Sequence, residues 1–164
     1  MGKKQAGSSE NALQSALRLL AFRDHSREEI RRKLMARGFD AEKIEEAVRG
    51  LEARELVDDS RYAQRLAFSF SRDKLLGPQR ISQKLWQKGI PADLAQAAIE
   101  KAEEDWAAGE RLQELLKKRL KGRVLQEMSL DEKKKLAAFL LRRGFLSEDV
   151  AAALRALGGF AEPC

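Results

Sequence analysis

The sequence predicts an all-α protein built as an array of three tandem three-helix repeats. Helix-forming residues (Ala, Leu, Glu, Lys, Arg and Gln) are abundant, whereas there are only 3 prolines and aromatic residues make up 6% of the chain. One pattern also occurs three times: apolar, three residues, apolar, two residues, basic, Gly, apolar. The glycines of this pattern are Gly38, Gly89 and Gly144, at spacings of 51 and 55 residues. A period of this size is typical of an array of supersecondary units.

The predicted repeats cover residues 11–57, 58–106 and 107–164, after a disordered tail at 1–10. The tail is basic and has no apolar run after it, so we do not interpret it as a signal peptide. No apolar run approaches the ~20 residues of a membrane span. Cys164 is the one cysteine, which excludes an internal disulfide framework and is consistent with a reducing cytoplasm.

Three helices are expected in the first repeat. The first covers about residues 11–23, where apolar residues recur at helical spacing. Ser26 is the predicted N-cap of the second, Glu29 completes a capping box, and Gly38 ends the helix. Asp40 is the predicted N-cap of the third. The residues expected to face inward are Leu13, Ala16, Leu17, Leu20, Ile30, Leu34, Ile44, Val48 and Leu51.

The second repeat begins at Asp58 and Asp59, either of which can cap its first helix. Within residues 74–90, Pro78 suits the first position of a helix, and Gly89 ends that helix in a left-handed cap. Pro91 starts the next helix. The inward-facing residues predicted here are Tyr62, Leu66, Phe70, Ile81, Leu85, Leu94, Ala98 and Ala102.

The third repeat contains one helix that stops near Gly122 and another that opens with a capping box of Ser129 and Glu132. Ser147 is predicted to cap the last helix, which ends at Gly158 and Gly159. The expected inward residues are Leu112, Leu115, Leu116, Leu120, Leu136, Leu140, Val150, Leu154 and Leu157.

Charge is distributed unevenly along a chain whose net charge is +6 and whose pI is about 9.6. Residues 61–88 hold seven bases and one acid, and residues 111–143 hold eleven bases and four acids. The third helix of a repeat is the reverse: residues 40–55 hold six acids and three bases, and residues 93–105 five acids and one base. We favour a basic face that neutralises phosphates; the alternative is a set of solvated helix surfaces.

The residues of an enzyme are missing from the sequence. His25 is the only histidine, and it is expected on the surface of an interhelix turn. It has no Cys cluster with which to bind a metal and no evident partner nucleophile. No Gly-rich nucleotide-binding motif occurs. The acid pairs 45–46, 58–59 and 103–104 are interpreted as caps and solvated positions, so we expect no enzymatic activity, no cofactor and no metal.

Trp86 allows two interpretations. It lies about a third of a turn away from the stripe of Ile81 and Leu85, at the register position that Met35 and Leu141 hold in the other repeats. An aromatic residue there could stack on a ligand or anchor a partner. We favour packing between repeats, because the equivalent residues are also apolar.

The chain resembles the RecX family, bacterial regulators of the RecA recombinase, over roughly residues 12–157. The resemblance is carried by A-L-R-L-L-A-F-R-D-H-S-R-E-E-I-R-R-K-L, L-V-D-D-S-R-Y-A, G-P-Q-R-I-S-Q-K-L-W-Q-K-G-I and F-L-L-R-R-G-F, at residues 16–34, 56–63, 77–90 and 139–145. Two positions depart from the family pattern. Leu75 stands where many members have Gly, which leaves the conformation of the 74–77 loop open, and Lys84 stands where an acid is common.

The resemblance implies an elongated, curved, non-enzymatic modulator that lies in the helical groove of the RecA–DNA filament. It implies inhibition of the RecA ATPase and of strand exchange, with a role in recombination, DNA repair and the SOS response. We expect a cytoplasmic monomer that contacts RecA, contacts DNA weakly and without sequence specificity, and has no contact with membranes. The alternative is a stand-alone DNA-binding module of helix-turn-helix type.

We expect the RecA- and DNA-binding face to consist of bases, mainly from the first two helices of each repeat. These candidates are Arg27, Arg31, Lys33, Arg61, Arg65, Arg72, Lys74, Arg80, Lys84, Lys88, Lys134, Arg142 and Arg143.

Overall fold

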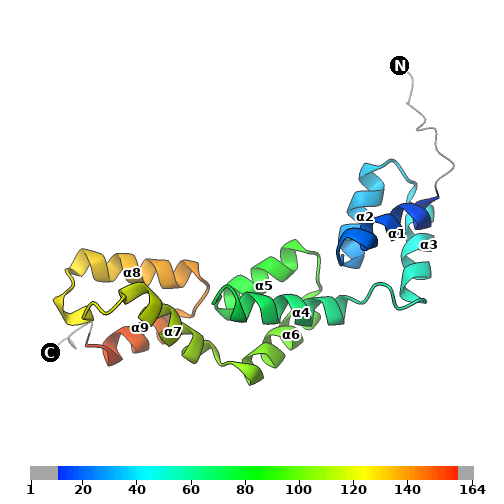
Figure 1. Ribbon diagram of the computed structural model, residues 1–164. Coiled ribbons are helices and arrows are strands. Elements are labelled where there is room, and N and C mark those ends of the chain that lie inside the picture. The colour runs from blue at the N-terminus through cyan, green and yellow to red at the C-terminus, as the bar shows by residue number, and fades with distance from the viewer. Residues whose placement is uncertain (1–10, 159–164) are drawn as a thin grey trace, which may run out of the picture. The chain divides into compact units, whose positions relative to one another are not determined.

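A computed structural model describes residues 11–158, and within them the chain is all-helical with no strand (Figure 1). The predicted tail at 1–10, Gly159 and Cys164 lie outside the described residues. The helices are α1 (Ala12–Phe22), α2 (Arg27–Ala36), α3 (Ala41–Glu52), α4 (Asp59–Arg72), α5 (Pro78–Gln87), α6 (Ala92–Asp105), α7 (Ala108–Leu120), the short 3-10 helix η1 (Leu125–Glu127), α8 (Leu130–Arg142) and α9 (Ser147–Ala156).

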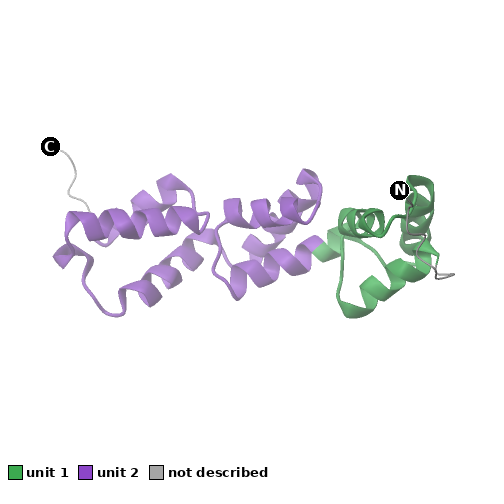
Figure 2. Cartoon of the chain, turned by 90° about the horizontal axis from the view of Figure 1, so that it is seen from above, with its two compact units in different colours: residues 1–62 green, residues 63–164 purple. Residues whose placement is uncertain are grey.

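The chain divides into two compact units, residues 1–62 and residues 63–164 (Figure 2). The division falls inside α4, so the first turn of this helix belongs to the first unit. In the first unit, α1, α2 and α3 close around one apolar core. Leu17 is exposed and was wrongly expected to face inward; Leu19 of the same helix is buried in its place. The buried core residues of this unit are Ala12, Ala16, Ile30, Leu34, Ile44, Ala47, Val48, Leu51 and Val57.

The three predicted glycine stops are confirmed as three copies of one hydrogen-bonded helix end. Gly38, Gly89 and Gly144 have φ values of +85°, +73° and +90°. At the second stop, the amide of Ile90 donates to the backbone carbonyl of Leu85 at 3.1 Å, and the amide of Gly89 donates to the backbone carbonyl of Trp86 at 2.8 Å. This is the Schellman pattern, and it repeats after α2 and α8. The leucine that accepts the long-range bond is fully buried each time, so the stop anchors each second helix to its core.

Helix starts agree with the sequence less uniformly. The capping boxes at Ser26 and Ser129 are confirmed. Asp40 occupies the N-cap of α3, but its side chain makes no capping bond and pairs with Lys43 at 3.2 Å instead. Ser147 is the first helical residue of α9 and Leu146 is the N-cap, so the predicted cap is wrong by one position. The cap of α4 is Asp58, whose carboxylate accepts the Arg61 amide at 2.9 Å.

Asp59, the other candidate cap, joins the first turn of α4 to the first turn of α2. It is 3% exposed and accepts the backbone amide of Arg27 at 2.9 Å and the Nε of Arg27 at 3.1 Å. One turn later, the Tyr62 hydroxyl donates to Glu29 at 3.2 Å, and Arg23 pairs with the same carboxylate at 2.9 Å. Because these groups are satisfied by one another, the start of α4 is fixed to the first repeat.

His25 was expected on the surface, and this expectation is wrong. Its ring is 4% exposed, and its Nδ1 lies 2.9 Å from the carbonyl oxygen of Arg23. Burial lowers the pKa of His25, because the charged imidazolium loses hydration. The physical reason is local: the turn between α1 and α2 leads into the buried residues Ser26 and Glu29, and the imidazole is buried with them.

Burial and the Glu29 carboxylate raise the pKa of Tyr62 from 10.0 to about 12. The neutral phenol is the form the native state favours, so its contribution to stability is complete below pH 10 and is lost as the pH rises through about 12. Tyr62 is the only tyrosine, so tyrosinate absorbance reports on it alone. The titration midpoint should lie near pH 12 in the folded protein and near pH 10 in urea, and Glu29→Gln should move the folded midpoint downward. Identical midpoints in the folded and unfolded chain would contradict the assignment.

Candidate interaction surface

The basic stripe of α5 is the first component of the site. Arg80, Lys84 and Lys88 recur every four residues and therefore lie along one side of the helix. Ile81 and Leu85 on another side are fully buried, which fixes the orientation of the helix. Arg80 is exposed, and Lys84 and Lys88 are half-buried.

Phe70, near the end of α4, brings two cations together. The Nζ atoms of Lys74 and Lys84 lie 5.4 Å and 5.5 Å from the centroid of its ring. These distances are in the range of cation–π attraction. Phe70 itself is buried, so the two ammonium groups lie over a fixed aromatic ring.

The loop before α5 is hydrogen-bonded to the helix end after α8. The Gly77 amide donates to the Arg143 carbonyl at 2.9 Å, and the Gln79 amide donates to the Gly144 carbonyl at 3.1 Å. The Arg143 guanidinium also donates to the Lys74 carbonyl. The first amides of a helix lack partners within the helix. Here carbonyls of the third repeat take the place of a side-chain cap, because the N-cap residue is Gly77.

Gly77 and Gly144 permit this contact because neither has a side chain. A Cβ on Gly77 would overlap the backbone of Gly144 and Phe145, and a Cβ on Gly144 would overlap the backbone of Arg80. The second and third repeats are therefore joined backbone to backbone. We call this contact the glycine junction.

Leu75 adopts a left-handed backbone conformation in the 74–77 loop, whose conformation could not be predicted from the sequence. Its φ is +48°, the left-handed region, and its side chain is 6% exposed within the core of the third repeat. A non-glycine residue costs roughly 1–2 kcal/mol in this conformation. Burying a leucine contributes about 1.5–3 kcal/mol and offsets that cost. The core that Leu75 joins consists of Leu112, Leu115, Leu116, Leu125, Leu136, Leu140, Phe145, Val150 and Leu154.

The glycine junction leaves a cavity of about 540 Å³ between α5 and the end of α8. Arg80 and Arg142 are exposed here, and no carboxylate among residues 11–158 pairs with either. Arg80 donates to the Gln83 side-chain oxygen. We call this cavity the junction recess; its lining residues are Gln79, Arg80, Gln83, Leu141, Arg142 and Gly144.

Among the candidate bases of the first two repeats, several have acidic partners. Arg27 pairs with Glu52 and Asp59, and Arg31 pairs with Glu45 at 2.6 Å. Arg72 pairs with Asp105 at 2.7 Å. Arg61 donates to the backbone carbonyl of Glu55. Lys33 and Arg65 are exposed.

Two candidate bases of the third repeat also differ in whether the structure engages their side chains. Lys134 is exposed on α8, and Arg143 lies over the ring of Phe139, at 5.9 Å from its centroid, besides bonding the Lys74 carbonyl. The structure therefore brings Arg80 and Arg142 together at the recess and Lys74 and Lys84 together at Phe70. It engages Arg27, Arg31 and Arg72 in ion pairs.

Arg111 was counted among the bases of the third repeat but does not belong to a surface. It is fully buried, donates to the Trp106 carbonyl, and lies 3.5 Å from Glu103. Burial lowers its pKa, and the Glu103 carboxylate opposes that effect. Glu103 therefore has a charge partner, whereas the sequence suggested only a solvated acid.

Trp86 is 74% exposed, so the expectation that it packs between repeats is wrong. The equivalent residues Met35 and Leu141 are 64% and 44% exposed. Apolar identity at this register therefore did not indicate burial. The buried stripe of each second helix consists of the two preceding apolar positions, and the residue after the second of them points away.

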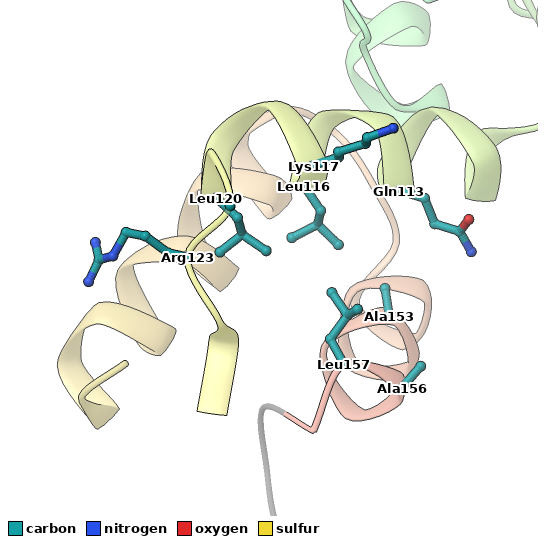
Figure 3. A pocket seen from close by; sticks show the side chains of 9 residues that line it. Gln113, Leu116, Lys117, Leu120, Arg123, Ala153, Ala156 and Leu157 are labelled. Atoms are coloured by element: carbon teal, nitrogen blue, oxygen red, sulfur yellow. The ribbon is translucent and has the colours of Figure 1, made fainter. Parts of the chain in front are cut away.

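A second, apolar pocket of about 370 Å³ lies in the third repeat, where Leu116 and Leu120 of α7 face Ala153 of α9 and Leu157, the residue that follows α9 (Figure 3). Leu157 is 44% exposed, so the expectation that it faces the core is wrong.

No group of three metal-ligating side chains occurs among the residues the structure describes. None of the helices described is long and apolar enough to cross a membrane.

These features define a class of proteins: tandem three-helix repeats with a cationic surface, whose described residues contain no group of three metal-ligating side chains. Family models identify the three repeats separately, as the first, second and third three-helix domains of RecX, at residues 12–50, 58–99 and 109–154. The chain belongs to the RecX family. The resemblance and the all-α fold of three tandem three-helix domains are thereby confirmed; the boundaries at 57/58 and 106/107 stay predictions.

Relatives named regulatory protein RecX match along most of the chain. The protein from Cronobacter sakazakii is 38% identical over 153 residues, covering 87% of this chain and 90% of that protein. The protein from Chlorobaculum tepidum is 37% identical over 139 residues, covering 85% and 83%. The crystal structure of RecX from Lactobacillus salivarius has the same fold, with a TM-score of 0.76 at 23% identity over 91% of this chain and 96% of that one. RecX proteins are regulators, which confirms the prediction of a non-enzymatic protein.

Two glycine-to-alanine variants, one at the glycine junction and one away from it, test whether close backbone contact is required there. Gly38→Ala should cost only about 1–2 kcal/mol, because the position has a positive φ but open space around it. Gly144→Ala has the same backbone strain and must also displace the Arg80 backbone. We expect Gly144→Ala alone to remove hydrogen-exchange protection from the amides of Gly77 and Gln79, whose acceptors lie at the junction. Equal protection of these amides in both variants would show that the junction does not depend on close backbone contact.

Proposed function

We propose that the protein binds the RecA filament on DNA and inhibits the RecA ATPase, recombination and strand exchange, and that it does so in the cytoplasm as a monomer. Its membership in a family of regulatory proteins supports the proposal, as does the resemblance to RecA regulators. The observation that carries it is the α5 surface, where Arg80 and Arg142 have no acidic partner within residues 11–158 and Lys74 and Lys84 share the Phe70 ring.

Unpaired cations are the groups that can bind phosphates at little cost. An arginine already paired with a carboxylate must lose that partner before it binds DNA, so Arg27, Arg31 and Arg72 are weaker candidates than Arg80 and Arg142. This narrows the proposed DNA-facing surface to α5 and the end of α8. The filament groove would supply phosphates, and RecA protomers would supply the remaining contacts.

The alternative is a stand-alone DNA-binding module. Such a module inserts the start of its second helix into a major groove, and exposed Gln79 and Arg80 lie at the start of α5. This helix start is engaged by the third repeat through the bond between the Gln79 amide and the Gly144 carbonyl. That contact favours the filament regulator, because it ties the candidate reading helix to its neighbour.

A titration of the protein on duplex DNA without RecA distinguishes the filament regulator from the stand-alone DNA-binding module. Weak, non-selective binding with a steep salt dependence supports the filament regulator. Tight, sequence-selective binding at ~150 mM salt would favour the stand-alone module.

The triple variant Arg80→Ala, Lys84→Ala and Lys88→Ala should weaken inhibition of the DNA-dependent RecA ATPase. A charge-assisted contact is worth about 1.5–3 kcal/mol, so losing even one raises the half-inhibitory concentration about tenfold or more. The matched control is Lys43→Ala, Lys118→Ala and Arg123→Ala, which removes the same charge from bases that are paired with Asp40, Glu114 and Glu132. Full inhibition by the first triple variant, or equal losses in both, would contradict the assignment to α5.

A further inference from the structure

The junction recess and Trp86 differ from the equivalent surfaces of the other two repeats in one respect. All three second helices expose an apolar residue at this register, but only α5 exposes an aromatic one. Trp86 follows Gln83 by three residues, so it lies on the next turn of the same helix face. Gln83 lines the recess and accepts a bond from Arg80. The exposed Trp86 therefore lies one turn of α5 from Gln83, which lines the same cavity as Arg80 and Arg142.

We propose that this surface binds a segment of single-stranded DNA, with one unpaired base stacked on Trp86 and the adjoining phosphate held between Arg80 and Arg142. The proposal rests on the proposed function, which leaves open the form of the DNA and the residues that touch it.

The chemistry favours a single strand over a duplex. An indole can stack only on a base whose face is free, and paired bases in a duplex cover each other's faces. Two guanidinium groups in a cavity one helical turn from the indole match a backbone that places a phosphate next to each base. The amides of Gln79 and Gln83 can donate to and accept from base edges, and they add contacts without demanding one sequence.

The glycine junction makes this surface a composite one. Arg80 comes from α5 and Arg142 from the end of α8, and they line one cavity because Gly77 and Gly144 bring the two helices into backbone contact. Neither the second nor the third repeat alone contains the pair. We therefore expect single-strand binding to depend on the junction as well as on the side chains.

The test is a fluorescence titration with an oligothymidylate of about 16 nucleotides, without RecA. The chain has two tryptophans, so the titration uses the full-length protein with Trp106→Phe, which leaves Trp86 as the reporter. Stacking should quench Trp86 as the oligonucleotide saturates the site. By anisotropy of a labelled oligonucleotide, Trp86→Ala should weaken binding about 5- to 150-fold, and Arg142→Ala should reduce the salt slope by about one.

The matched control is Met35→Ala, which removes the equivalent exposed side chain of the first repeat and should leave oligonucleotide affinity unchanged. Binding without quenching, or equal affinity in wild type and Trp86→Ala, would overturn the proposal. The RecA ATPase assay runs in parallel. If Trp86→Ala loses inhibition but keeps oligonucleotide affinity, Trp86 contacts protein and the stacking proposal is wrong. If wild type binds the oligonucleotide with quenching but does not inhibit RecA, the proposed function fails and this proposal stands.

Discussion

The backbone contact between Gly77 and Gly144 is the constraint on which the proposed interaction surface depends. It supplies carbonyl acceptors from the stop after α8 to the amides of Gly77 and Gln79 at the start of α5, and it has no room for a Cβ on either glycine. Because backbone meets backbone, the geometry does not vary with side-chain rotamers. Arg80 and Arg142 are consequently neighbours across a cavity rather than residues of two separate repeats.

The same contact shows how one local motif serves two purposes. In the first repeat, the stop at Gly38 ends a helix and has open space around it. In the third repeat, the stop at Gly144 has the same backbone conformation and also forms the junction. The first repeat uses side chains instead: Asp59 and Tyr62 of α4 bind Arg27 and Glu29 of α2 through charged and hydrogen-bonded groups. The chain thus contains a glycine contact in one unit and a polar network in the other.

The features that could be predicted from the sequence are those with local determinants. The stops at Gly38, Gly89 and Gly144 and the boxes at Ser26 and Ser129 follow from residue types within one turn, and the fold class followed from their repetition. Features that tertiary packing decides could not be predicted in this way. His25 is buried by its surroundings, and Trp86 is exposed although packing between repeats was expected. Of the two possible caps of α4, Asp58 is the cap, and only the structure shows that Asp59 binds Arg27 instead. The placement of Arg80 and Arg142 in one cavity could not be predicted, because it depends on the contact between Gly77 and Gly144. The binding role of the thirteen candidate bases stays a prediction.

A density map of the protein bound to a RecA filament on DNA would test the proposed binding mode most directly. We expect density in the helical groove, with α5 and the end of α8 facing the DNA and with Arg80 and Arg142 within reach of phosphates. Density confined to the outer surface or to a filament end, or an orientation in which α5 points away from the DNA, would contradict it.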